Sequence, residues 1–297
     1  MWYERYKTQR GRAWGNYAVL VLAILCAWPD QDVPAASKVT GVLTAKDALT
    51  VPNRQATVEA RLVQQGFMGE RGLGGESLEL EIGGKTVATA MTGGDGRAYF
   101  QYTPTMRGNM VFGVALPGSP RVEASRVSGL LAVWEHRKPI LLVEAAALVD
   151  PQSEPPVPTV PFGKSDLPEP RPSADAAEEL ARLAQFYYNV MYVATPDEGR
   201  FPRGRSTEFR QWLEANRFPN GLIVHEKINA DGLGARLDEL KKEGWTAIKN
   251  GIGRTPAFAG VLVERRMDAV LVPEPAKGEL PRKAKTAKDW KDVRKKL

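Results

Sequence analysis

Residues that hold metals or cross-link small domains are scarce in this sequence. The 297 residues include one cysteine, Cys26, and two histidines, His136 and His225. A single cysteine excludes an intramolecular disulfide, and so small a set disfavours a zinc site of the usual Cys/His type. A Ser-His-Asp triad is possible in composition, but no G-x-S-x-G motif indicates one.

A charge excess is also lacking outside the C-terminus. The formal net charge is +6, and residues 277–297 contain nine Lys or Arg against three acids, so this stretch carries all of it. Such a basic tail, residues 276–297, can contact anionic lipid or nucleic acid. We expect a solvated, frayed chain end. No stripe of basic and aromatic residues elsewhere indicates a nucleic-acid partner.

Hydrophobic runs long enough for a bilayer are missing too. The apolar run at residues 17–28 has twelve residues, whereas a spanning helix needs about 20. Four basic residues precede it within the first twelve positions, which is typical of a signal peptide. We therefore expect residues 1–36 to be a signal peptide or a membrane anchor held through residues 14–28. Cleavage, lipidation at Cys26 and retention all stay open.

Residues 37–135 alternate between polar and apolar side chains with a period of two, which predicts short strands. Gly- and Pro-rich turns separate these segments, and about seven strands in such a length are typical of an immunoglobulin-like β-sandwich. The stretch "TGGDGRAYF" from Thr92 also resembles a hairpin of bacterial immunoglobulin-like domains. Asp95 within it is expected to be a turn residue rather than a Ca²⁺ ligand. The Gly-rich segment 65–76 is expected to be a mobile connection.

Residues 138–275 alternate between predicted strands and helices, which favours an α/β parallel sheet with helices on both faces. A Pro-rich insertion at 150–173 separates the first strand from a helix that Ser173 is expected to cap. The predicted strands are residues 139–143, 189–195, 221–225, 257–263 and 269–272. The predicted helices are residues 174–188, 206–218 and 232–244.

Polar side chains at or near the strand ends form the candidate site, because chemistry in such sheets lies at the carboxyl edge. Glu144 ends the first strand, Thr195 ends the second, and Lys249 precedes the predicted fourth. Glu264 and Asp268 follow that fourth strand. Whether Glu144, Thr195, Lys249 and Asp268 converge in space tests this prediction.

This order of an acid, a hydroxyl, a lysine and two acids resembles the four motifs of the haloacid dehalogenase (HAD) superfamily. Residues 191–214 and "TPAFAGVLVERRMDAV" from Thr255 look like stretches of its lipin-type phosphatidate phosphatases, in which a β-sandwich also precedes the first catalytic strand. The resemblance implies a Rossmann-like fold and a phosphoric monoester hydrolase acting on a substrate such as phosphatidate. Mg²⁺ would then be held by Glu144, Glu264 and Asp268.

The first motif departs from the D-x-D-x-T pattern of that family. Here the matching residues are "EAAAL", so Glu144 replaces the nucleophilic aspartate and Ala146 replaces the general acid/base. Thr195, Lys249 and Glu264 also have plain interpretations as a loop start, a solvated residue and a surface charge cluster. A buried Glu144 needs a partner, and Lys249, Arg265 and Arg266 are candidates.

Two functions follow from this pattern. The first is an exported, non-catalytic scaffold or binding protein, a pseudo-phosphatase without a cofactor. Its partner would be another protein of the bacterial periplasm or cell envelope, or the membrane surface. The second is a divergent Mg²⁺-dependent phosphatase. The missing acid at Ala146 favours the first.

Overall fold

The computed structural model describes residues 37–67, 69–153, 170–196, 206–275 and 280–297. Within this part, Val39–Leu297 forms one unit of contacts. The predicted signal or anchor segment and most of the Pro-rich insertion lie outside the described residues. Among those described, no helix is both long and apolar enough to cross a bilayer.

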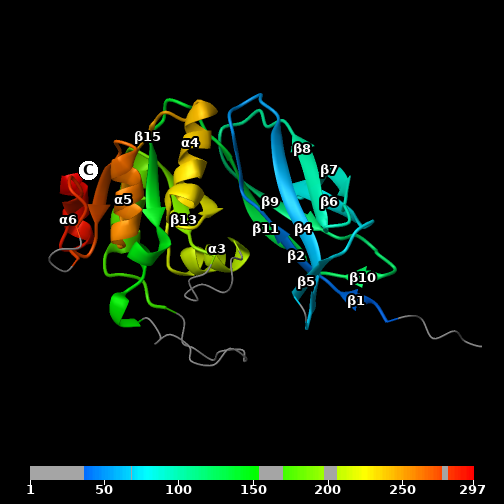
Figure 1. The fold of residues 1–297 in the computed structure, drawn as a ribbon. Coiled ribbons are helices and arrows are strands. Elements are labelled where there is room, and N and C mark those ends of the chain that lie inside the picture. The colour runs from blue at the N-terminus through cyan, green and yellow to red at the C-terminus, as the bar shows by residue number, and fades with distance from the viewer. Residues whose placement is uncertain (1–36, 68, 154–169, 197–205, 276–279) are drawn as a thin grey trace, which may run out of the picture. The chain divides into compact units, whose positions relative to one another are not determined.

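Two antiparallel-rich sheets pack face to face in the N-terminal half (Figure 1). One contains β2 (Val42–Ala45), β4 (Ala56–Gly66), β5 (Gly69–Gly72) and β8 (Arg97–Tyr102). The other has the order β3 (Ala48–Thr50), β11 (Val127–Val133), β9 (Gly108–Ala115), β6 (Ser77–Ile82) and β7 (Lys85–Met91). Alternate side chains of both sheets, such as Val58 and Leu80, share one core, so this half is a β-sandwich.

Two features of the sandwich correct the sequence predictions. The segment 65–76 is not simply a connection, because β4 continues into it and pairs with β5, with Val63 opposite Gly72. A Cβ on Gly72 would lie 2.2 Å from the carbonyl carbon of Asp95, so the hairpin packs directly on that turn. Asp95 itself accepts a hydrogen bond from the Arg97 N–H at 3.1 Å, as a turn residue does. A short pair, β1 (Val39–Thr40) with β10 (Val122–Glu123), was also not predicted.

Strand β11 is buried on both faces. Leu131 and Val133 belong to the sandwich core, whereas Leu130, Ala132 and Trp134 belong to a second core that extends into the C-terminal half. This strand therefore reads as a continuous apolar run rather than an alternating one, and the period-two pattern did not reveal it.

The C-terminal half contains a six-stranded sheet in which every pairing is parallel, as predicted. Its order is β14 (Leu222–His225), β13 (Asn189–Ala194), β12 (Ile140–Glu144), β15 (Ile248–Gly253), β16 (Asp268–Leu271) and β17 (Lys285–Thr286). The chain builds outward from β12 to β14 and then returns to the other side of β12 with β15. The strand order therefore reverses between β12 and β15, which is the switch point of the sheet.

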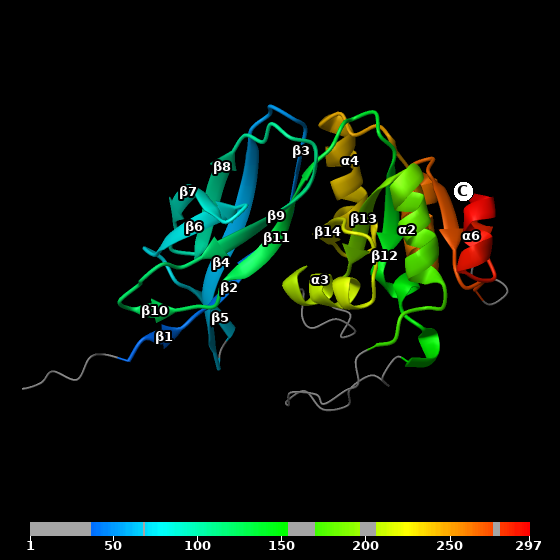
Figure 2. The same cartoon turned by 180° about the vertical axis from the view of Figure 1, so that it is seen from behind.

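The helices fall into two groups that pack against alternate side chains of β12 (Figures 1 and 2). Leu141 and Val143 share a core with α2 (Ala176–Phe186), α3 (Ser206–Ala215) and α6 (Trp290–Lys296). Ile140 and Leu142 share the other core with α4 (Ala235–Lys242), which follows the π-helical turn η4 (Ala230–Gly234), and with α5 (Pro256–Glu264). The helix α3, which the sequence predicted at 206–218, buries Phe209, Trp212 and Leu213.

Residues 257–263, predicted as the fourth strand, are helical, and that prediction was wrong. Thr255 caps the helix α5 by accepting the Phe258 N–H at 3.2 Å, and Pro256 occupies its first turn. The fourth strand is β15, whose glycines mask it in the sequence. A Cβ on Gly251 or Gly253 would lie 2.3 Å from an α5 side chain, so these glycines allow α5 to pack closely on β15.

Two further predictions were wrong at the ends of elements. Ser173 does not cap α2, because its hydroxyl donates to the Ala147 carbonyl at 3.1 Å, and Asp175 precedes the helix with no side-chain cap. The C-terminus from residue 280 onward is not a frayed tail. Strand β17 joins the sheet there, and α6 buries Trp290 and Val293.

Candidate functional site

Glu144 ends β12 at the switch point and is only 1% exposed. Its Oε2 accepts hydrogen bonds from the N–H groups of Arg254 and Thr255, at 2.6 and 2.9 Å. Its Oε1 accepts the Thr255 hydroxyl proton at 2.5 Å. The carboxylate therefore binds the residues at which α5 begins.

The N-terminus of a helix carries unpaired N–H groups and a partial positive charge, which together bind anions. In open parallel sheets, ligands bind outside the carboxyl ends of the strands at the switch point. In this protein the side-chain carboxylate of Glu144 occupies the position at the helix N-terminus and the switch point. A Cβ on Gly253 of β15 would lie 2.7 Å from Glu144 Oε2, so only glycine fits at this position beside the carboxylate.

The alanines after Glu144 form the 3-10 helix η1 (Ala145–Leu148), all of which is buried. Their backbone carbonyls hold neighbouring segments. The Ala146 carbonyl accepts from the Arg254 guanidinium at 3.4 Å, and the Ala147 carbonyl accepts from the Trp290 indole at 3.3 Å. This turn is consequently a packing element, and a second short helix, η2 (Pro151–Ser153), follows it.

The five predicted site residues lie in three different places. Thr195 follows β13 and is half-buried at the same edge as Glu144. Lys249 is exposed near the start of β15, and Asp268 begins β16 opposite Asn250, which is level with Leu141. Asp268 is therefore three residues short of Glu144 along the sheet, roughly 10 Å.

Glu264 is the last residue of α5, and its side chain is 69% exposed beside Arg265. The structure therefore does not bring the five residues together. The part of the chain that it describes also contains no group of three His, Cys, Asp or Glu side chains that could hold a metal ion. Glu144, Glu264 and Asp268 accordingly do not form the Mg²⁺ set that the resemblance implied. Arg265, one expected partner of Glu144, forms an ion pair with Asp238 at 3.0 Å.

A cavity of about 920 Å³ lies elsewhere, between the sandwich and the outer edge of the parallel sheet. Strands β2 and β4 form one wall, and the start of α3, the end of β14 and the side chains of α4 form the other. Its charged side chains are mostly paired with one another, as in Arg61 with Glu70 and Arg236 with Glu239.

Ser206 and His225 line this cavity, with Ser206 Oγ 2.9 Å from His225 Nε2. Ser206 begins α3, and His225 ends β14 at the carboxyl edge of the sheet. Burial lowers the pKa of His225, which favours the neutral ring. Its Nδ1 is buried and has no hydrogen-bond partner among the described residues. The sequence pattern did not predict this pair, although a histidine at the end of a predicted strand was a usable signal.

Asp47 and Arg210 form a buried ion pair at the base of the cavity. Asp47 also accepts from the N–H groups of Ile223 and Leu130, at 2.7 and 2.8 Å. Burial raises the pKa of Asp47, and the Arg210 guanidinium and these N–H groups oppose that shift. The pair thus joins α3, β14 and β11 to the end of β2 and fixes both walls of the cavity.

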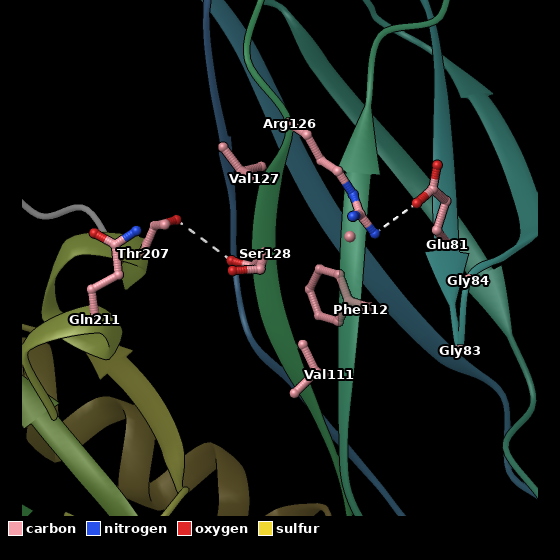
Figure 3. A pocket seen from close by; sticks show the side chains of 11 residues that line it. Glu81, Gly83, Gly84, Val111, Phe112, Arg126, Val127, Ser128, Thr207 and Gln211 are labelled. Atoms are coloured by element: carbon pink, nitrogen blue, oxygen red, sulfur yellow. Dashed lines mark hydrogen bonds and ion pairs between the residues drawn. The ribbon is translucent and has the colours of Figure 1, made fainter. Parts of the chain in front are cut away.

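A smaller pocket of about 390 Å³ lies over β9 and β11 (Figure 3). The Arg126 guanidinium pairs with Glu81 at 2.6 Å and lies over Gly113, where a Cβ would be 2.3 Å away. Thr207 donates to the Ser128 carbonyl at 3.5 Å across the pocket. These contacts give the pocket a structural role, and it contains no pair of catalytic groups among the residues that line it.

The comparisons with known proteins do not assign a family. Neither the protein-family models nor the curated proteins give a match. Among solved structures, the D00-D0 domain of intimin is 15% identical over 31% of this chain and 46% of that one, with a TM-score of 0.24. A cell-surface-expressed chitinase from Paenibacillus is 12% identical over 80% of this chain and 27% of that one, with a TM-score of 0.26.

A family 39 glycoside hydrolase from Bacteroides cellulosilyticus is 8% identical over 77% of this chain and 50% of that one, with a TM-score of 0.24. This chain therefore spans half or less of each of these three solved chains. These TM-scores are too low to indicate a fold or a function for this chain.

Proposed function

We propose that the protein is an exported scaffold or binding protein whose phosphatase-like site is non-catalytic. The observation that carries this proposal is the burial and hydrogen bonding of the Glu144 carboxylate. Its carboxylate is buried and serves as the acceptor for the residues at the start of α5. A nucleophile for in-line phosphoryl transfer must instead face the phosphorus, with its position fixed to within a fraction of an ångström.

The surroundings of Glu144 support the same conclusion. Ala146 offers no group to protonate a leaving oxygen, and it is buried. Lys249 and Asp268 lie toward the opposite edge of the sheet. Of the predicted site acids, all of which are described, only Glu144 lies at this edge, and it is already engaged, whereas the HAD-type reaction needs two acids, a lysine and Mg²⁺.

Each half of the chain is proposed to have a known fold class. We assign residues 37–135 to an immunoglobulin-like domain, supported by the two sheets with a shared core and the "TGGDGRAYF" hairpin. We assign residues 138–275 to a degenerate HAD-like, Rossmann-like domain, supported by its all-parallel order around β12 and its two helix groups. Of the four motifs that the resemblance implied, only those at Glu144 and Thr195 lie at the ends of strands on the carboxyl edge of the sheet.

Export and envelope partners are proposed from the basic and apolar N-terminal sequence. Fractionation of cells that express the full chain with a C-terminal tag tests the location. Intact mass of the exported protein separates cleavage from lipidation at Cys26. Recovery only from the cytoplasm would refute this part of the proposal.

Hydrolysis of a generic phosphomonoester, with and without Mg²⁺, tests the non-catalytic assignment. We expect no Mg²⁺-dependent turnover from the full-length protein, from Glu144→Gln or from Glu144→Ala, while the two variants lose stability. Clear Mg²⁺-dependent turnover that disappears in Glu144→Gln, with folding verified by circular dichroism, would overturn the proposal in favour of a divergent phosphatase.

A further inference from the structure

We propose that Ser206 is a nucleophile activated by His225, and that the cavity beside β2 accepts an uncharged carboxylic ester whose acyl group is transferred to Ser206. The Oγ–Nε2 distance of 2.9 Å is within reach for proton transfer between a nucleophile and its base. This site is separate from Glu144 and its neighbours and does not depend on the function proposed for them.

Both groups face the space that a ligand would occupy. Ser206 is 7% exposed and His225 is partly buried, and both line the cavity of about 920 Å³. A volume of this size is within the range of pockets that hold small organic molecules. Their positions at the start of α3 and the end of β14 place them on regular elements rather than on a loop.

His225 meets Ser206 through Nε2 and, among the described residues, lacks the second hydrogen bond expected of a buried structural histidine. A buried structural histidine normally has partners on both ring nitrogens, since an unpaired buried polar atom is costly. Here Nε2 meets Ser206, while Nδ1 has no partner among the described residues. Burial keeps the ring neutral, so Nε2 can accept the serine proton.

The start of α3 supplies the electrostatic component. The first N–H groups of a helix have no partner within it, and the helix dipole makes this end positive. A carbonyl oxygen that becomes negative during attack by Ser206 would be stabilised there. Because Ser206 is itself the first residue of this ten-residue helix, nucleophile and N–H groups share one element.

The charges around the pair select the ligand. Glu226 follows His225 directly in the chain and lines the cavity. Each cation that lines the cavity already pairs with an acid, and these cations are Lys46, Arg61, Arg97 and Arg236. An anionic acyl group would therefore be repelled, and an uncharged one is favoured.

The reaction is a simple acyl transfer. Ser206 Oγ forms a bond to the ester carbonyl carbon while its proton passes to His225 Nε2. The carbon–oxygen bond to the leaving alcohol then breaks, and the imidazolium returns the proton to that oxygen. The products are an acyl-serine and a free alcohol, with His225 neutral again. No carboxylate orients Nδ1 within the described part of the chain, so we expect the acyl-serine to accumulate rather than turn over.

Covalent labelling of the full-length protein tests this inference. The probes are p-nitrophenyl acetate and an uncharged fluorophosphonate, and intact mass and peptide mapping measure the adduct. The variants are Ser206→Ala, His225→Gln and the matched control Ser125→Ala, which removes an exposed cavity serine for which the structure shows no hydrogen bond. Thermal unfolding confirms that each variant is folded.

We expect one adduct on Ser206 in the wild type and in Ser125→Ala, and none in Ser206→Ala. His225→Gln should slow labelling by about 100-fold, the usual contribution of a positioned base. A folded wild type that stays unlabelled would overturn the inference. Labelling that persists in Ser206→Ala, or that is equally fast in His225→Gln, would do the same. None of these results depends on phosphatase activity, so the two proposals fail independently.

Discussion

Replacing Glu144 by alanine should destabilise the protein far more than replacing it by glutamine. Alanine leaves the N–H groups of Arg254 and Thr255 buried without their acceptor. Each orphaned donor costs about 1–3 kcal/mol, so the expected loss is about 2–6 kcal/mol. Glutamine keeps one oxygen that can accept both N–H groups and loses mainly the charge at the start of α5, about 0.3–2 kcal/mol.

Urea unfolding of the full-length variants, followed by circular dichroism, measures these free energies. Glu264→Ala is the matched control, because that side chain is largely exposed at the other end of α5, and its effect should stay within about 0.5 kcal/mol. The reasoning is refuted if Glu144→Ala is as stable as the wild type. Equal losses in the alanine and glutamine variants would also refute it, since they would show that the N–H groups do not depend on the oxygen.

Three other perturbations have defined outcomes. Asp47→Ala leaves Arg210 buried without its charge partner, so it should cost about 3–5 kcal/mol in urea unfolding, and the double variant with Arg210→Ala should cost less than the sum of the singles. The pKa of His225 is lowered in the fold, so the unfolded chain takes up a proton first and stability should fall as pH falls through about 6.5, with a slope of at most about 1.4 kcal/mol per pH unit. His225→Gln should flatten this dependence, and an unchanged pH profile would count against a buried neutral ring. Trp290→Ala should cost about 3–5 kcal/mol, because the indole is buried and donates to the Ala147 carbonyl; a wild-type unfolding midpoint would instead indicate a loose C-terminus.

The spacing of apolar residues was sufficient to locate an element that has one exposed face or a long buried run. Strands such as β4 and β6 alternate, as the pattern of residues 37–135 indicated. Strands β12 and β13 are continuous apolar runs, and the sequence located both. It failed for β15, where Gly251 and Gly253 make room for α5 and remove the strand signal. The apolar run of α5 then took the place of the missing strand, although Thr255 and Pro256 mark a helix start.

The wrong assignment of residues 257–263 as a strand also put Glu264 and Asp268 wrongly in the candidate site. With residues 257–263 read as a strand, Glu264 and Asp268 followed a carboxyl end. With the same residues helical, Glu264 ends a helix and Asp268 begins the next strand. Glu144 was correctly placed at a strand end, but its acceptor role depends on a turn 110 residues away, which local patterns do not report. The Ser206–His225 pair depends on a contact between elements in the same way.

The double burial of β11 has a consequence for how the protein folds. Half of its side chains complete the sandwich, and the other half complete the core beneath α4 and α5. Neither half of the chain can therefore form its interior alone without presenting an apolar stripe to water. The boundary near residue 136 divides two architectures, but it does not divide two cooperative units. A chain cut there would yield fragments prone to associate, and the intact chain should melt as one.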